Sequence, residues 1–234
     1  MLRQINSEYM RAFLIFLLFS NLLNGASGQS VKKHRLYIQG FKAYQAAVKK
    51  DKKKELVEIK SAIPSVKLDI RYATTHNFMH QVMYQQARAF ARKEVVEQLK
   101  KIQQELYKKG YGLLIFDGYR PYAITVAFYQ KASDKNFVAN PAKGSIHNRG
   151  CAVDLTLISL KTGKEVAMPT PYDSFSAAAA ANYAKVSPAA LKNRTLLIST
   201  MQKYGFTVMP NEWWHFDYKG WESYELMDIP FGLL

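Results

Sequence analysis

Two short stretches of this chain carry residues that could hold a metal ion. His147 and Asp154 lie in the first, SIHNRGCAVD, and Glu212 and His215 lie in the second, EWWH. Zinc binds imidazole and carboxylate ligands in a tetrahedron, and a catalytic zinc site keeps one position for water. His147, Asp154 and His215 are therefore candidate ligands for one zinc ion, and Glu212 is a candidate base that would not bind the metal.

The spacing within each stretch sets a condition on the local backbone. Gly150 permits a tight bend after His147, so that Asp154 can return toward the metal on the following strand. Glu212 and His215 are three residues apart, and on a regular strand such residues point to opposite faces. The two side chains converge only if residues 211–213 form a turn, for which Pro210-Asn211 has the appropriate chemistry.

Each of these residues also has a more ordinary interpretation. A lone histidine near the start of a strand is more often a structural residue than a ligand, and Glu212 beside two tryptophans could be a surface acid. The metal hypothesis gains weight because ligands, base and a hydrophobic wall occur together. His76 and His80 have helical spacing for a metal pair, but the sequence supplies no third ligand near them.

The motifs resemble those of the D-alanyl-D-alanine dipeptidases, a family best known from vancomycin resistance. The similarity extends from about residue 57 to the C-terminus. Three motifs that carry it are DGYRP at 117–121, RYATTHNF at 71–78 and the Glu-x-x-His pair. The fourth is a Ser-x-His motif that has one spacer residue fewer than the family's general form. Its residues are Ser145, His147, Arg149-Gly150, Ala152 and Asp154. Ile146 and the alanine-rich tract 174–184 differ from the family pattern, and both could reshape the substrate pocket.

The resemblance implies a function and a role for each site residue. The function is zinc-dependent hydrolysis of D-Ala-D-Ala to two D-alanines. Glu212 would be the general acid and base, and Arg120 would stabilise the developing oxyanion. Without the resemblance, Arg120 would be read as a surface or salt-bridge residue. The implied metal ligands are His147, Asp154 and His215, and the implied substrate contacts are Asp173, Ser145 and Tyr72. Asp173 follows a proline and could equally be a turn-forming acid.

The elements around these motifs predict an α+β fold, a single compact domain with a central antiparallel sheet flanked by helices. The resemblance implies the zinc D,D-peptidase fold shared with the hedgehog signalling domain. Apolar spacing predicts a helix over 88–110 that ends at Gly110, a helix beginning near Pro121, and a helix from Ser187-Pro188 to Gly205. Predicted strands cover 65–73, 113–116, 151–158, 206–209 and 214–218. The tract 174–184 is expected to be a loop or a short helix.

The N-terminal residues 1–28 have the pattern of a secretory signal peptide. Arg3 and Arg11 precede the apolar run 12–23, and small residues follow at 25–28. Met10 could be the true start, and an uncleaved membrane anchor is the alternative interpretation. The pattern predicts an exported protein of the periplasm or cell envelope. The single cysteine, Cys151, excludes an internal disulfide and is expected to be a small buried residue rather than a ligand or nucleophile.

Basic residues concentrate ahead of the predicted domain. The net charge is +15, and residues 31–60 carry ten Lys or Arg against three acids. We expect a basic lead-in over 29–60, a boundary near residue 60, and the catalytic domain over 61–234. An anionic envelope surface is a possible partner for 31–60, a solvated extension without a partner is equally compatible, and export disfavours nucleic acid.

Three other functions are compatible with the sequence. A D,D-carboxypeptidase acting on peptidoglycan stem peptides would use the same metal chemistry in a more open site. A non-catalytic, zinc-stabilised envelope-binding module would need neither Glu212 nor Arg120, so the presence of both argues against it. A wall- or membrane-surface protein would act through the basic residues 31–60.

Overall fold

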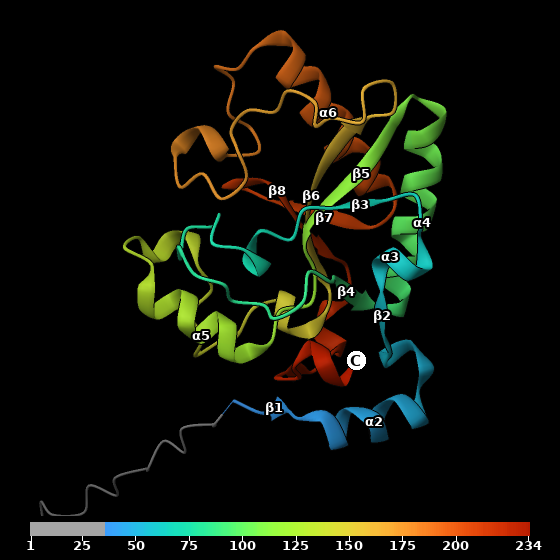
Figure 1. Cartoon of the computed structure of the whole chain (residues 1–234), viewed down its shortest axis with the longest axis vertical. Coiled ribbons are helices and arrows are strands. Elements are labelled where there is room, and N and C mark those ends of the chain that lie inside the picture. Colours follow the sequence, from blue (N-terminus) through green and yellow to red (C-terminus); the bar gives the residue numbers. More distant parts are fainter. Residues whose placement is uncertain (1–35) are drawn as a thin grey trace, which may run out of the picture. The chain divides into compact units, whose positions relative to one another are not determined.

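A five-stranded sheet forms the centre of the computed structural model, which describes residues 36–234 (Figure 1). The strands lie in the order β3 (Lys67–Leu68), β5 (Tyr111–Asp117), β6 (Ala152–Ser159), β8 (Glu212–Tyr218) and β7 (Phe206–Met209). Neighbouring strands are antiparallel except β3 and β5, which are parallel. The predicted α+β class with a mostly antiparallel sheet is confirmed.

Two long helices cover one face of this sheet. Helix α4 (Lys93–Lys108) contacts β5, helix α6 (Pro188–Lys203) contacts β6, β7 and β8, and the two helices contact each other. Helix α5 (Tyr122–Lys131) lies across the sheet from α4 (Figure 1). The predicted helix ends are confirmed at two places: Gly110 follows α4 with φ +83°, and the Ser187 hydroxyl accepts a hydrogen bond from the Ala190 backbone N–H at 3.2 Å.

Two predicted elements are wrong in part, because pairing and packing override local pattern. The helix expected from residue 88 begins at residue 93, since β4 (Phe90–Arg92) pairs with β2 (Leu56–Glu58). The strand expected over 65–73 is reduced to β3, and residues 71–73 form the 3₁₀ turn η2 (Arg71–Ala73). In this turn the Tyr72 ring packs on Phe128 with 4.7 Å between ring centroids, instead of alternating along a strand.

Residues 36–60 pack with the rest of the described chain. Strand β1 (Ile38–Gln39) pairs with β9 (Leu226–Met227), and helix α2 (Phe41–Lys50) buries Tyr44, whose hydroxyl accepts a hydrogen bond from the Leu56 N–H at 2.8 Å. The compact unit runs over Leu36–Leu234, so it begins before the boundary expected near residue 60. The remaining short elements are η1 (Lys52–Lys54), α3 (Ile59–Ala62), η3 (Lys135–Phe137), η4 (His147–Arg149), η5 (Ala177–Ala179), η6 (Trp221–Ser223) and η7 (Phe231–Leu233).

Cys151 and the N-terminal segment were the subject of separate predictions. Cys151 is fully buried, as expected, and burial raises the pKa of its thiol to about 12, which makes it a poor nucleophile or ligand. No helix within residues 36–234 has the length and apolar content needed to cross a membrane. The expected signal peptide, residues 1–28, lies outside the described residues, as does the first part of the basic segment.

Candidate metal centre and active site

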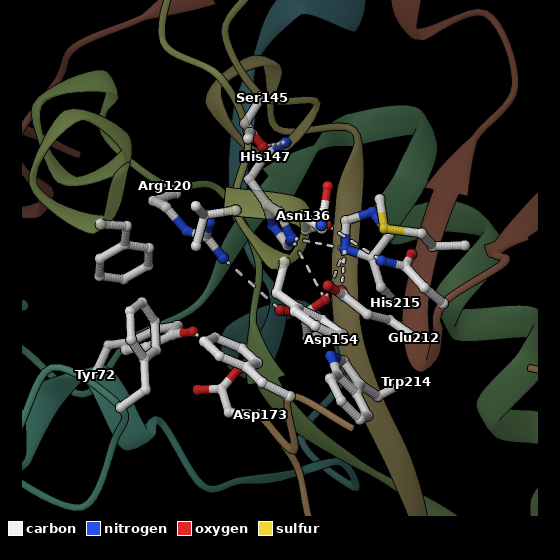
Figure 2. A pocket seen from close by; sticks show the side chains of 18 residues that line it. Tyr72, Arg120, Asn136, Ser145, His147, Asp154, Asp173, Glu212, Trp214 and His215 are labelled. Atoms are coloured by element: carbon white, nitrogen blue, oxygen red, sulfur yellow. Dashed lines mark hydrogen bonds and ion pairs between the residues drawn. The ribbon is translucent and has the colours of Figure 1, made fainter. Parts of the chain in front are cut away.

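Three of the predicted residues meet at one point on the sheet. Asp154 on β6 lies directly opposite His215 on β8, and His147 reaches them from the turn η4 (Figure 2). The Nδ1 atom of His215 is 3.0 Å from the Oδ1 atom of Asp154, and the Nε2 atom of His147 is 3.1 Å from the Nδ1 atom of His215. The Nε2 atom of His147 is 3.4 Å from the same Asp154 oxygen. All three residues are buried.

Hydrogen bonds on the far side of each ring set which nitrogen faces the cluster. The Nδ1 atom of His147 is 2.7 Å from the Gly118 carbonyl oxygen, which can only accept, so this nitrogen carries the proton. The Nε2 atom of His215 is 2.9 Å from an Asp217 carboxylate oxygen, which assigns the proton there in the same way. Asp217 was not predicted from the sequence, although its position two residues after His215 on one strand places both side chains on one face.

The donor atoms fit a zinc ion. With protons on these outer nitrogens, the remaining nitrogen of each ring can point a lone pair inward, and the Oδ1 atom of Asp154 is buried with no hydrogen-bond partner. Such a set is costly without a cation between its members, because three acceptors face one another in a buried place. Two imidazoles and one carboxylate, with a hydrogen-bond acceptor on the outer nitrogen of each ring, match the ligand types of catalytic zinc sites. The predicted ligands are the one cluster of this kind within residues 36–234.

The bend between His147 and Asp154 depends on Gly150 and on an unpredicted asparagine. Gly150 has φ +71°, a left-handed conformation that favours glycine, and a Cβ there would lie 2.6 Å from Leu56 Cδ2. The buried Asn148 side chain donates to the Arg120 carbonyl at 2.9 Å and accepts from the Ser145 N–H at 2.8 Å. This amide therefore connects the histidine turn to the segment that carries Arg120.

Glu212 lies beside the cluster, with Oε2 3.8 Å from the Nδ1 atom of His215. The predicted turn over 211–213 is wrong in extent: the turn is confined to 210–211, and Glu212 already belongs to β8. A register shift solves the geometric problem instead. Val208 pairs with Phe216 but Met209 pairs with Glu212, so the intervening residues of β8 bulge and the alternation is broken. Burial raises the pKa of Glu212 to about 7, although His215 opposes the shift.

Arg120 is buried on the other side of the cavity and is held by Asp117. Its Nε and Nη2 atoms donate to the Oδ2 atom of Asp117 at 3.0 and 2.8 Å, and Nη2 is 3.8 Å from Asp154. Burial alone would lower the pKa of Arg120, but Asp117 together with Tyr84, Tyr72 and Asp154 outweighs this effect and raises it, so the guanidinium stays charged. Asp117 also accepts from the Tyr84 hydroxyl at 2.9 Å. Its role was missed, although it precedes Arg120 by three residues in DGYRP.

The three predicted substrate contacts all line the same cavity, which has a volume of about 210 Å³. The Tyr72 hydroxyl donates to the Oδ1 atom of Asp173 at 3.1 Å, whereas the Oδ2 atom of Asp173 is buried without a partner. Burial, reinforced by the charge of Asp154, raises the pKa of Asp173 well above its ordinary value. The Ser145 hydroxyl accepts from the His147 N–H at 3.2 Å. The cavity is smaller than the roughly 300–1,000 Å³ typical of drug-sized ligand sites, so it suits a small substrate.

Other residues differ from their sequence interpretations. Tyr172 was not predicted, yet its hydroxyl donates to the Oδ2 atom of Asp154 at 2.9 Å and so orients this carboxylate. Its ring stacks on Phe116 with 4.4 Å between centroids. His76 and His80 are exposed and lie in an irregular segment, so the hypothesis that they share one helical face is wrong.

A buried His–Asp–His cluster with an acid beside it, at the edge of a small cavity, is the arrangement found in zinc peptidases. A family model described as D-Ala-D-Ala dipeptidase matches residues 52–227. The chain belongs to this D-Ala-D-Ala dipeptidase family, and the expected enzyme class is confirmed.

Individual relatives agree with this assignment. The chain is 34% identical over 178 residues to the D-alanyl-D-alanine dipeptidase of Escherichia coli, covering 76% of this chain and 92% of that protein. It is 33% identical over 179 residues to the D-alanyl-D-alanine dipeptidase of Enterococcus faecium, covering 66% and 86%. A solved LD-carboxypeptidase, LdcB, aligns at 23% identity with a TM-score of 0.38, over 57% of this chain and 61% of that one.

Proposed function

We propose that this protein hydrolyses D-Ala-D-Ala to two D-alanines, with one zinc ion held by His147, Asp154 and His215. The observation that carries the proposal is the convergence of these three donor groups in a small cavity, with Glu212 on one side and Arg120 on the other. When bound, zinc supplies Lewis acidity and makes water nucleophilic near neutral pH.

Glu212 is the proposed general acid and base. Its carboxylate takes a proton from the attacking water and passes this proton to the nitrogen of the leaving D-alanine. A raised pKa suits both steps, because the ideal catalytic pKa lies near the working pH. Its burial also keeps bulk water from competing for the proton.

Arg120 and Asp173 are the proposed groups that orient the substrate. The Arg120 guanidinium donates to the carbonyl oxygen as negative charge develops on it, and Asp117 holds the guanidinium in place. Asp173 accepts the substrate ammonium through its unpaired Oδ2 atom, and this cation would restore the charged form of a carboxyl that burial disfavours. Tyr72 orients Asp173, and Ser145 contacts the other end of the dipeptide.

The test is release of D-alanine from D-Ala-D-Ala by the purified full-length protein. We expect release to stop after chelation and to return when zinc is added. The Glu212→Gln variant should keep stoichiometric zinc but lose turnover by about 10²- to 10⁴-fold, the usual contribution of a general acid–base group. Release that persists after all zinc is removed, or full activity in Glu212→Gln, would contradict the proposal.

We further propose that the protein is exported to the periplasm or cell envelope and that residues 31–60 contact an anionic surface there. The pattern of residues 1–28 and the basic composition of 31–60 support this proposal. Cell fractionation with N-terminal sequencing of the mature protein tests export. Retention of the intact protein in the cytoplasm would contradict it.

A further inference from the structure

Aromatic rings from three distant segments close the cavity beside Asp173. We call Phe78, Phe137 and Phe175 the aromatic wall. The Phe137 and Phe175 rings stack with 4.9 Å between centroids and 9° between planes, and the Phe175 ring lies 5.1 Å from that of Phe78. All three residues line the cavity and are only half-buried, so the wall stands between the site and solvent.

The segment that carries Phe137 lines the cavity with residues 136–139. Its turn η3 is closed by Asp134, whose carboxylate accepts from the Asn136 N–H at 2.9 Å. The Asn136 carbonyl accepts from the Asn211 side chain at 3.3 Å, next to Glu212 in the turn between β7 and β8. The segment therefore contacts Phe175 through the stacked Phe137 ring, and it contacts the turn next to Glu212 through the Asn136 carbonyl.

A second depression lies behind the wall. Phe78 and Asp173 line both this depression and the catalytic cavity, and the other residues of the depression are Arg71, Thr75, His76, Asn77, His80 and Tyr172. Phe78 thus separates two spaces that meet at Asp173. A substrate residue preceding the dipeptide would have to pass the wall to reach the second space.

We propose that the aromatic wall restricts this enzyme to free dipeptides by excluding peptides that continue beyond the amino end of D-Ala-D-Ala. The inference rests on the proposed function, in which Asp173 holds the substrate ammonium. Phe78 and Asp173 border both spaces, and Phe175 lines the cavity beside them, so the wall lies where an additional residue beyond Asp173 would extend. Steric exclusion by packed rings, rather than the metal chemistry, then separates a dipeptidase from a carboxypeptidase acting on stem peptides.

The test compares kcat/KM for D-Ala-D-Ala with kcat/KM for L-Lys-D-Ala-D-Ala, a tripeptide that keeps a free amine. We expect Phe137→Ala, Phe175→Ala and Phe78→Ala to raise the tripeptide-to-dipeptide ratio by about 10-fold or more, the scale of discrimination that a small steric misfit produces. Tyr107→Ala removes an exposed ring from α4, away from the cavity, and should leave the ratio unchanged.

The possible outcomes distinguish an error in the role given to the aromatic wall from an error in the proposed function. An unchanged ratio in variants that melt near the wild-type temperature would overturn the role of the wall, and so would wild-type protein that cleaves both peptides equally. If an alanine variant does not fold, Phe137→Leu and Phe175→Leu keep the apolar volume but lose the flat stack, and the same ratio is measured. If wild-type protein cleaves neither peptide, the proposed function fails. The wall is then tested by binding alone: calorimetry measures the affinity of both peptides for the zinc-loaded Glu212→Gln variant and for the same variant that also carries Phe137→Ala. Equal changes in both affinities would then overturn it.

Discussion

Each histidine of the cluster is oriented by the ring nitrogen that faces away from it. The Gly118 carbonyl accepts from His147, and the Asp217 carboxylate accepts from His215. These partners hold the rings in the tautomers that leave a lone pair for a metal ion, and losing a hydrogen-bond partner of this kind typically lowers metal affinity by about 10- to 100-fold. Only the Asp217 contact comes from a side chain, so only this contact can be removed by substitution.

Replacing Asp217 by alanine should weaken zinc binding by about 10- to 100-fold, the usual effect of removing the group that hydrogen-bonds a metal-binding histidine. His215 would lose the acceptor that fixes its tautomer and ring orientation. Competition with a chromophoric chelator measures the dissociation constant. Asp217→Asn keeps an acceptor oxygen and should show a smaller loss. An affinity for zinc in Asp217→Ala equal to that of the wild type would contradict the role given to this carboxylate.

Arg120→Lys should lower kcat by about 10²- to 10³-fold with a small change in KM, because the lost donors act on charge that develops in the transition state. A lysine cannot reproduce the contact of Nε and Nη2 with Asp117. Steady-state kinetics measures the effect. Arg88→Lys is the matched control, since Arg88 donates similarly to Glu58 at 2.8 Å away from the cavity. Comparable losses in both variants would show that Arg120 has only a structural effect.

At the scale of elements, the end of β5 connects most of the site. Asp117 ends this strand at a register shift, and Gly118 then passes so close to β4 that a Cβ would lie 2.5 Å from the Phe90 carbonyl oxygen. The next residue, Tyr119, donates its N–H to the same oxygen at 2.6 Å. Residues 117–120 therefore carry the Asp117 carboxylate that binds Arg120, the Gly118 carbonyl that accepts from His147, and Arg120 itself.

Gly118→Ala should force the end of β5 away from β4, because the clash is with backbone rather than with a flexible side chain. We expect a stability loss of about 1–3 kcal/mol, typical of overpacking, and lower zinc affinity because the Gly118 carbonyl moves with the backbone. Urea unfolding and zinc titration measure the two effects. Gly232→Ala, where a Cβ would meet its nearest neighbour at 3.8 Å, is the control. Wild-type zinc affinity in Gly118→Ala would show that the close approach does not position the site.

At the scale of the whole molecule, an ion-pair network joins the two helices that cover the sheet. Glu105 on α4 accepts from Lys203 of α6 at 2.6 Å, from Tyr204 at 2.9 Å, and from Lys109 at 2.9 Å. Hydrogen bonds from Lys203, Lys109 and Tyr204 lower the pKa of Glu105 to about 2. The network lies away from the cavity, so its effect on stability can be separated from catalysis.

The lowered pKa of Glu105 predicts how this network depends on pH. A carboxyl whose folded pKa lies below its unfolded value of roughly 4.3 stabilises the fold above that value and loses the contribution as pH falls toward 2. Glu105→Gln should therefore be less stable than wild type at pH 7, with a difference that shrinks below about pH 4. Urea unfolding at pH 7, 4 and 3 measures this trend. Glu97→Gln, an exposed acid on the same helix, is the control, and a Glu105→Gln difference that does not vary with pH would contradict the prediction.

Local patterns predicted the elements whose ends depend on their own residues. Helix α6 begins at Ser187-Pro188 because the serine caps its first turn, and α4 ends before Gly110 because a left-handed residue stops a helix. The apolar runs predicted β5 and β6. The same reasoning failed at residues 65–73, where Tyr72 turns toward the aromatic residues of the cavity, and at β4, whose pairing with β2 has no local signal.

Residue types and spacing alone predicted the metal ligands and the adjacent acid, because two histidines and a carboxylate in these motifs, with a further carboxylate nearby, form an unusual combination: His147, Asp154, His215 and Glu212. The role predicted for Arg120 came only from the resemblance of DGYRP to the family. How these groups are held became visible in the fold, through Asp117, Tyr172, Asp217 and the Gly118 carbonyl. Acids, tyrosines and carbonyl groups are common in any chain, so their type carries no signal. Their roles arise when strand pairing and a bulge bring segments far apart in sequence within hydrogen-bonding distance.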